Sequence, residues 1–130
     1  MNTIKERYVN REIAKLLKDK GFDIPVNYEY HYLITVPQFH RKKHDFNGIE
    51  YRNCSSEWYS APTQAMACDW LIENYKIHID VSFVSGKGFV GSICDISNPD
   101  NSLSMLDTKC YPNIEQVYNE ALKYILTTMI

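Results

Sequence analysis

Two segments of alternating residues, joined by a short glycine-containing turn, constrain the fold of this chain most strongly. Between 77 and 84 apolar and polar side chains alternate, with Ile77, Ile79, Val81 and Phe83 on one side and His78, Asp80 and Ser82 on the other. This period of two is typical of a strand with one buried face. The turn Ser85-Gly86-Lys87-Gly88 leads into a second strand over 89–96. Strands joined by so short a turn pair antiparallel.

The remaining elements surround this hairpin. Apolar residues at helical spacing predict helices over 3–20, 60–75 and 113–130. Ser60 is the predicted N-cap of the second helix, and Asn113 that of the third. Further strands are predicted over 26–36, 49–52 and 103–106. No strand–helix–strand alternation occurs, so we expect an α+β fold. The sequence predicts one domain over residues 1–130, with an antiparallel sheet of four to five strands, about three helices on one face, and the order α-β-(β)-α-β-β-(β)-α.

Length and charge limit the functional classes. The chain has 130 residues, 45% of them hydrophobic, and this composition excludes disorder, collagen, coiled coils and disulfide-framed miniproteins. Its net charge is −2, so no global attraction to nucleic acid or anionic lipid is expected. The charge is uneven: residues 1–53 sum to +3 (10 basic, 7 acidic) and residues 54–130 to −5 (4 basic, 9 acidic). Either a basic binding face, two complementary halves or chance explains this asymmetry.

The cysteines indicate a compartment. Cys54, Cys68, Cys94 and Cys110 lie too far apart in sequence for a zinc knuckle or a redox pair. The first residues contain no apolar signal region, and no apolar run approaches the roughly 20 residues that span a bilayer. We therefore expect a cytoplasmic protein with reduced thiols and no membrane partner.

Catalytic, cofactor and metal sites are not predicted. The Ser85–Gly88 turn lacks the spacing of a phosphate-binding loop. His40 and His44 are separated by three cations, which would repel a metal ion. His78 and Asp80 share a strand face and could form an acid–base pair, but solvent-facing alternation explains them more simply. We expect a protein that is not an enzyme.

Aromatic residues on the 26–36 strand raise the possibility of nucleic-acid binding. Tyr28, Tyr30 and Tyr32 repeat on one face about 7 Å apart, and bases stack on such rows in single-strand binders. Cations that could hold phosphates are Arg7, Arg11, Lys15 and Lys18 on the first helix and Arg41, Lys42 and Lys43 beyond the strand. Ile34 and Val36 continue the tyrosine face, however, which favours a face buried under helices. Both interpretations stay open.

A protein contact is the leading hypothesis, either with another protein or in a homodimer. Met66 and Trp70 lie four residues apart on the polar side of the 60–75 helix. An exposed Trp and Met pair fits a binding hot spot. The alternative is that the first helix or the 37–56 segment covers them within the monomer.

Three segments, EIAKLLKDKGFD (12–23), WYSAPTQAMACDWLIENYKIHIDV (58–81) and EALKYILTTMI (120–130), together resemble a family of small proteins without an assigned function. These proteins come from Bacteroides-type gut bacteria and from their phages or other mobile elements. The resemblance covers about half the chain and depends chiefly on the stretch 61–65 (APTQA) and on Trp70-Leu71. It implies a cytoplasmic accessory role, related to phages, and no chemistry.

Overall fold

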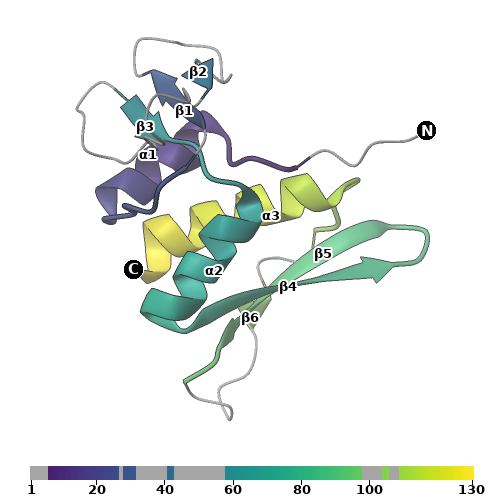
Figure 1. Ribbon diagram of the computed structural model, residues 1–130. Coiled ribbons are helices and arrows are strands. Elements are labelled where there is room, and N and C mark those ends of the chain that lie inside the picture. The colour runs from purple at the N-terminus through teal and green to yellow at the C-terminus, as the bar shows by residue number, and fades with distance from the viewer. Residues whose placement is uncertain (1–5, 27, 32–40, 43–57, 98–103, 106–108) are drawn as a thin grey trace. The chain divides into compact units, whose positions relative to one another are not determined.

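The computed structural model describes residues 6–26, 28–31, 41–42, 58–97, 104–105 and 109–130 (Figure 1). The chain divides into two compact units, Met1–Ala65 and Met66–Ile130, and each is considered by itself. Within the described residues there are three α-helices, a π-helical turn and six strands in two antiparallel sheets of three. The α+β class is therefore confirmed. The strands are shared between two sheets, where the sequence predicted one, and the single-domain interpretation stays a prediction.

The first unit places its central strand between two short ones. β1 (Tyr28–His31) pairs antiparallel with β2 (Arg41–Lys42) and with β3 (Trp58–Ser60). In this register Tyr30 faces Tyr59. Helix α1 (Arg11–Asp19) contacts β3. The predicted return strand over 49–52 lies outside the described residues.

Helix α1 begins later than the predicted helix over 3–20. The Asn10 side chain accepts a hydrogen bond from the Ile13 amide at 2.9 Å, and this cap starts the helix at Arg11. The residues before Asn10 are used differently, because Tyr8 forms an antiparallel bridge with Thr63 and the Val9 amide donates to the Pro62 carbonyl at 3.0 Å. The start predicted at residue 3 is wrong for residues 6–10, where backbone pairing replaces the helix.

The same pairing moves the start of the second helix. α2 spans Gln64–Tyr75, and the predicted cap Ser60 instead ends β3. The Ala61 amide donates to the Tyr28 carbonyl at 2.9 Å, which extends the strand contact past Ser60. Residues 61–63 are therefore held in the connection between β3 and α2, and the helix begins only after them, at Gln64.

The second unit is built on the predicted hairpin. β4 (Ile77–Val84) and β5 (Gly88–Asp95) form eight consecutive antiparallel pairs, and β6 (Ser104–Met105) pairs with the other side of β5. Helix α3 (Ile114–Tyr124) packs on β4 and β5 and continues into a π-helical turn, Ile125–Met129. The Asn113 side chain accepts from the Gln116 amide at 2.9 Å, so the predicted cap is confirmed.

The helices of this unit cover one face of its sheet. Figure 1 shows α2 and α3 on the same side of β4 and β5. Buried side chains of the strands and of the last helix are Ile77, Ile79, Ile93, Val117, Ala121, Leu122, Ile125 and Leu126. Their burial against each other gives the unit a continuous apolar core. None of the described helices is both long and apolar enough to cross a lipid bilayer.

Replacing Gly88 by alanine should destabilise the hairpin more than the same change at Gly86. Both glycines have positive φ, +114° and +77°, which costs an alanine about 1–2 kcal/mol. Only at Gly88 would the new Cβ collide with the Tyr111 carbonyl oxygen, the atom that accepts a hydrogen bond from the Phe89 amide. Urea denaturation should show a loss in unfolding free energy at least about 1 kcal/mol larger for Gly88→Ala. Equal losses would contradict this account.

Candidate functional site

Tyr30, the middle tyrosine of the predicted row, belongs to the core of the first unit. The Tyr30 ring is 5% exposed, and its hydroxyl donates to the Val9 carbonyl oxygen at 2.9 Å. A buried phenol needs such a partner, because an unpaired hydroxyl away from water is costly. Of the two interpretations left open by the sequence, the buried one holds at Tyr30. This ring cannot serve as a stacking platform for a base.

The neighbouring tyrosines do not make a row of open rings either. Tyr28 is half-buried and meets Tyr8 edge to face, with ring centroids 5.1 Å apart and an angle of 69°. The Tyr8 hydroxyl donates to a Glu6 carboxylate oxygen at 2.9 Å. Burial and the nearby Glu6 charge raise the pKa of Tyr8 to about 12. Tyr32, the third member of the predicted row, lies outside the described residues.

Three of the four cations of the predicted ridge lie on α1, and two of them contact an aromatic ring. The Arg11 guanidinium and the Lys18 ammonium lie 5.7 Å and 5.3 Å from the centroid of the Tyr59 ring, so both cations contact an aromatic face of their own unit. Lys15 is exposed on α1, and Arg7 is exposed but precedes the helix. Arg41 and Lys42 form β2, and Lys43 lies beyond the described part of the chain. The structure therefore keeps Arg11, Lys15 and Lys18 on one helix, as the sequence predicted, but Arg7 precedes that helix.

The Trp70 ring is not the exposed anchor that the sequence predicted. It is 8% exposed and packs edge to face against Tyr75, with centroids 5.4 Å apart, while Met66 is half-buried. The indole is therefore covered, which is the alternative that the sequence left open, and Tyr75, the last residue of α2, is one of its neighbours. A role for Met66 and Trp70 in a protein contact stays a prediction.

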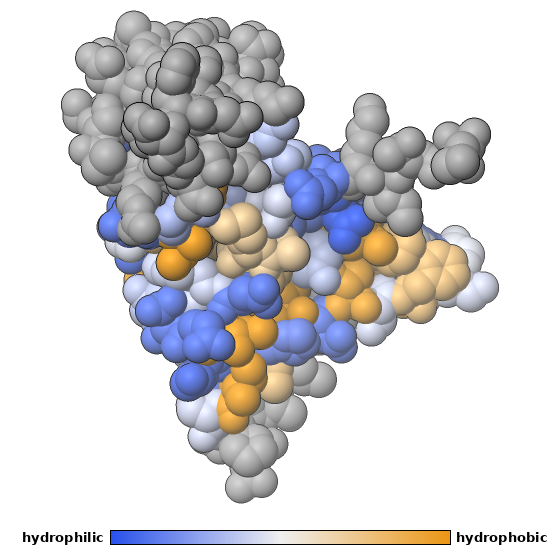
Figure 2. All heavy atoms as spheres, viewed as in Figure 1, coloured by the Kyte–Doolittle hydropathy of each residue, from blue (hydrophilic) through white to orange (hydrophobic). Residues whose placement is uncertain are grey.

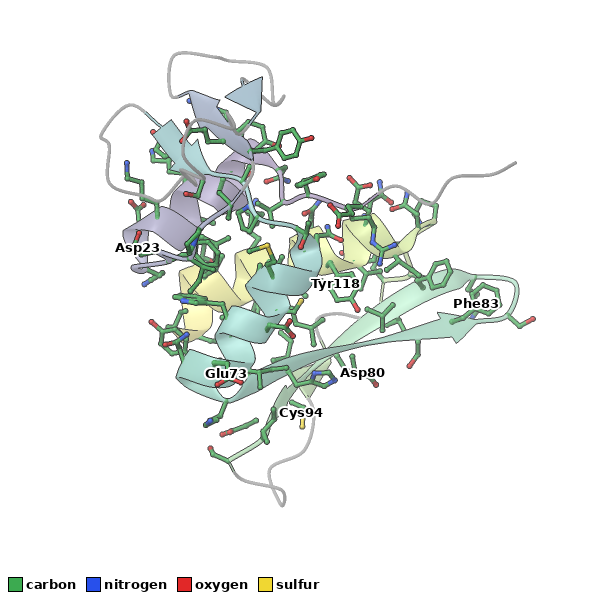
Figure 3. The ribbon with its side chains drawn as sticks, in the orientation of Figure 1. Asp23, Glu73, Asp80, Phe83, Cys94 and Tyr118 are labelled. Atoms are coloured by element: carbon green, nitrogen blue, oxygen red, sulfur yellow. The ribbon has the colours of Figure 1, made fainter. Side chains whose placement is uncertain are left out.

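A pair of aromatic residues, the exposed Phe83 and the half-buried Phe89, lies instead at the turn end of the β4–β5 hairpin. Phe83 is 64% exposed, the highest value for a large apolar side chain among the described residues. Its ring lies 5.2 Å from that of Phe89, its direct cross-strand partner. Figure 3 shows Phe83 beside the turn, and Figure 2 shows apolar surface gathered over this end of the hairpin.

The hairpin end is held in place from its other side. The Phe89 amide donates to the Tyr111 carbonyl at 2.8 Å, and the Tyr111 amide donates to the Phe89 carbonyl at 2.7 Å. The Lys109 ammonium lies 5.2 Å from the centroid of the Tyr111 ring. These contacts fix the backbone beneath the two phenylalanines. The ring of Phe83 is thus presented to solvent by a rigid strand and not by a loop.

Sequence reasoning placed Phe83 on the apolar face of its strand but missed its exposure. On this face Ile77 and Ile79 are buried, Val81 is half-buried and Phe83 is exposed. Burial falls steadily toward the turn because the covering helices do not extend that far. The sequence does place Phe83 and Phe89 directly beside the turn, and this position is the one feature that could have indicated the exposure of Phe83.

The opposite face of the hairpin carries the polar residues considered for catalysis. His78 faces Cys94 across the two strands and Asp80 faces Ser92, while His78 and Asp80 are exposed. Figure 3 shows Asp80 and Cys94 on the side away from α2 and α3. Exposure to water weakens any acid–base or nucleophilic assistance on this face. Among the described residues no group of three His, Cys, Asp or Glu could hold a metal ion.

Comparison with protein-family models, with curated proteins and with solved structures finds no match. The resemblance to small proteins of gut bacteria and their phages therefore stays an expectation.

Replacing Tyr30 by phenylalanine should lower the unfolding free energy by about 1–3 kcal/mol, because the buried Val9 carbonyl loses its donor. The exposed Tyr124 provides a matched control, and Tyr124→Phe should change stability by less than about 0.5 kcal/mol. Urea titrations of both variants test this. A neutral Tyr30→Phe would show that the hydroxyl is not buried in solution.

The Cys68 thiol should resist alkylation in the folded protein. Burial, with the Asp69 charge adding to it, raises the pKa of Cys68 from 9.0 to about 12, so at pH 8 the thiolate is roughly a thousandfold rarer than in the unfolded chain. Labelling with iodoacetamide, read for each cysteine by peptide mass spectrometry, should modify Cys68 in urea but not in buffer. Equal rates in both conditions would contradict its burial.

Proposed function

We propose that this chain is a non-enzymatic protein-interaction module that binds a partner through the turn end of its β4–β5 hairpin. The observation that supports this proposal is the Phe83 ring, which is mostly exposed and is buttressed by Phe89 at 5.2 Å. Large aromatic side chains on rigid elements are the usual anchors of protein interfaces, because they bury much apolar area and lose little entropy on binding.

The chemistry of the hairpin end describes the partner. The turn carries one charged residue, Lys87, which is exposed close to Phe83. A complementary protein surface would offer an apolar recess for the Phe83 ring and a carboxylate near its rim for Lys87. The acidic second half of the chain disfavours a nucleic acid at this place.

The proposal includes a cytoplasmic, accessory role. Cys68, Cys94 and Cys110 are free thiols, which is the state that a reducing compartment maintains. The resemblance of three segments to small proteins of gut bacteria and their phages is consistent with such a role. In this compartment the partner is another protein of the cell or of an infecting element.

The Phe83→Ala variant should lose its partner. Tagged protein expressed in native cells should capture a defined protein at constant stoichiometry, and Phe83→Ala should reduce this capture roughly tenfold or more. The control is Tyr124→Ala, which removes an aromatic ring that is 39% exposed on α3. This variant should retain the partner. Circular dichroism should show both variants folded, since both side chains are exposed.

The same capture, repeated after nuclease treatment, separates the two functional classes. A protein contact survives nuclease, whereas a contact through DNA or RNA is lost. Capture that disappears with nuclease, or that Phe83→Ala leaves unchanged, would contradict the proposed function.

A further inference from the structure

The outer edge of β4 is the longest open strand edge in the described part of the chain. The sheet order is β4-β5-β6, so one side of β4 faces no described strand. The other edge strands, β2, β3 and β6, have two or three residues, whereas β4 has eight. Open edges expose unpaired N–H and C=O groups that can pair with another strand.

The hydrogen bonds at the far side of β5 show which groups of β4 point outward. Phe89 exchanges both of its backbone bonds with Tyr111, so its N–H and C=O point away from β4. Along an antiparallel strand the backbone N–H and C=O groups of successive residues point alternately to one side and to the other. When the groups of one residue point away from the neighbouring strand, the groups of the residue facing it on that strand point away as well. The backbone groups of Phe83 and, by alternation, of Val81, Ile79 and Ile77 therefore point to the open edge. The bond from the Ile96 amide to the Lys76 carbonyl agrees, because it assigns the even-numbered positions to β5.

Apart from the charge of Asp80, this edge lacks the features that keep strand edges apart. Its eight residues contain no Pro, Gly, Lys or Arg, and the pairing with β5 runs without a bulge. Proteins that must stay unpaired usually interrupt a long edge with one of these features. The β4 edge is thus suited to accept a strand.

The exposed charges beside the edge select a second copy of the same strand. Two copies related by a two-fold axis perpendicular to the sheet keep their inner faces on one side. Three central registers then bring the outward groups together. A register centred on Asp80 places Asp80 of one copy against Asp80 of the other. A register centred on Val81 places Asp80 of one copy against Ser82 of the other. A register centred on Ile79 places His78 against Asp80 on both sides of the axis.

Only the register centred on Ile79 pairs the Asp80 carboxylate with a side chain that can carry a positive charge, because the register centred on Val81 offers it the neutral Ser82 hydroxyl. An imidazole N–H donates to a carboxylate whether or not the ring is charged, and opposite charges facing across strands are stabilising while like charges are not. His78 and Asp80 are both exposed on the outer face, so they are available for these pairs.

We propose that the protein forms a homodimer by antiparallel pairing of β4 with β4 of a second copy, centred on Ile79. Ile77 then faces Val81 and Ile79 faces its own copy, and each facing pair exchanges both backbone hydrogen bonds. The result is a continuous six-stranded sheet. This inference does not depend on the proposed function, because the Phe83 ends remain free at opposite ends of the paired strands.

Sedimentation velocity of the full chain, from about 1 µM to about 1 mM, tests the dimer through three variants. His78→Asp and Asp80→His each place like groups opposite one another and should raise the dissociation constant roughly tenfold or more. The double variant His78→Asp/Asp80→His restores both pairs with exchanged positions, and its dissociation constant should return to within about threefold of wild type. Glu120→Lys, a charge reversal at an exposed position on α3, should leave it unchanged.

Amide hydrogen exchange gives a second, direct readout. At low concentration the Ile79 and Val81 amides should exchange quickly, while the His78 and Asp80 amides are protected by β5. At high concentration the Ile79 and Val81 amides should become protected as well. A chain that stays monomeric throughout this range, a double variant no tighter than the single ones, or outward amides indifferent to concentration would each overturn the proposal. Loss of partner capture in Phe83→Ala would affect none of these measurements, so the two proposals fail independently.

Discussion

The register between β4 and β5 is the constraint on which the second unit depends. A turn with Gly86 and Gly88 at positive φ sets eight consecutive pairs, beginning at Val84 and Gly88. A slip of one residue would exchange the two faces of a strand, turning Ile77 and Ile79 to water and His78 and Asp80 toward α3. The same register places Phe83 against Phe89 and decides which backbone groups reach the open edge. Core, aromatic end and strand edge thus follow from one turn.

Local patterns predicted the elements whose boundaries are set locally. The strand over 77–84 and the cap at Asn113 were both predicted to the residue, because alternation, turn and cap lie within a few neighbouring positions. The starts of α1 and α2 were not. Ser60 is a good cap by type, but the pairing of its segment with Tyr28 recruits it into β3. Such pairing joins residues more than 30 positions apart, and no local preference encodes it.

The candidate site shows the same division. Periodicity assigned Tyr30 and Phe83 correctly to apolar faces, yet one is buried and the other is mostly exposed. The difference arises from where the covering element ends, which is a property of the packing. The cations of α1 are similar, because Arg11 and Lys18 lie seven residues apart on a helix and contact the same Tyr59 ring. The sequence shows a basic face but not the ring that occupies it.

The two surfaces of the hairpin use different residues and different chemical groups. The aromatic end offers side chains, whereas the β4 edge offers backbone groups of Ile77, Ile79 and Val81, so both can be occupied together. A dimer through the edge would carry two aromatic ends on one rigid sheet. Two weak contacts linked in this way bind a repeated or multimeric partner far more tightly than either contact alone, because the second binding event becomes intramolecular. A small chain that presents Phe83 can thereby reach a useful affinity without a large interface.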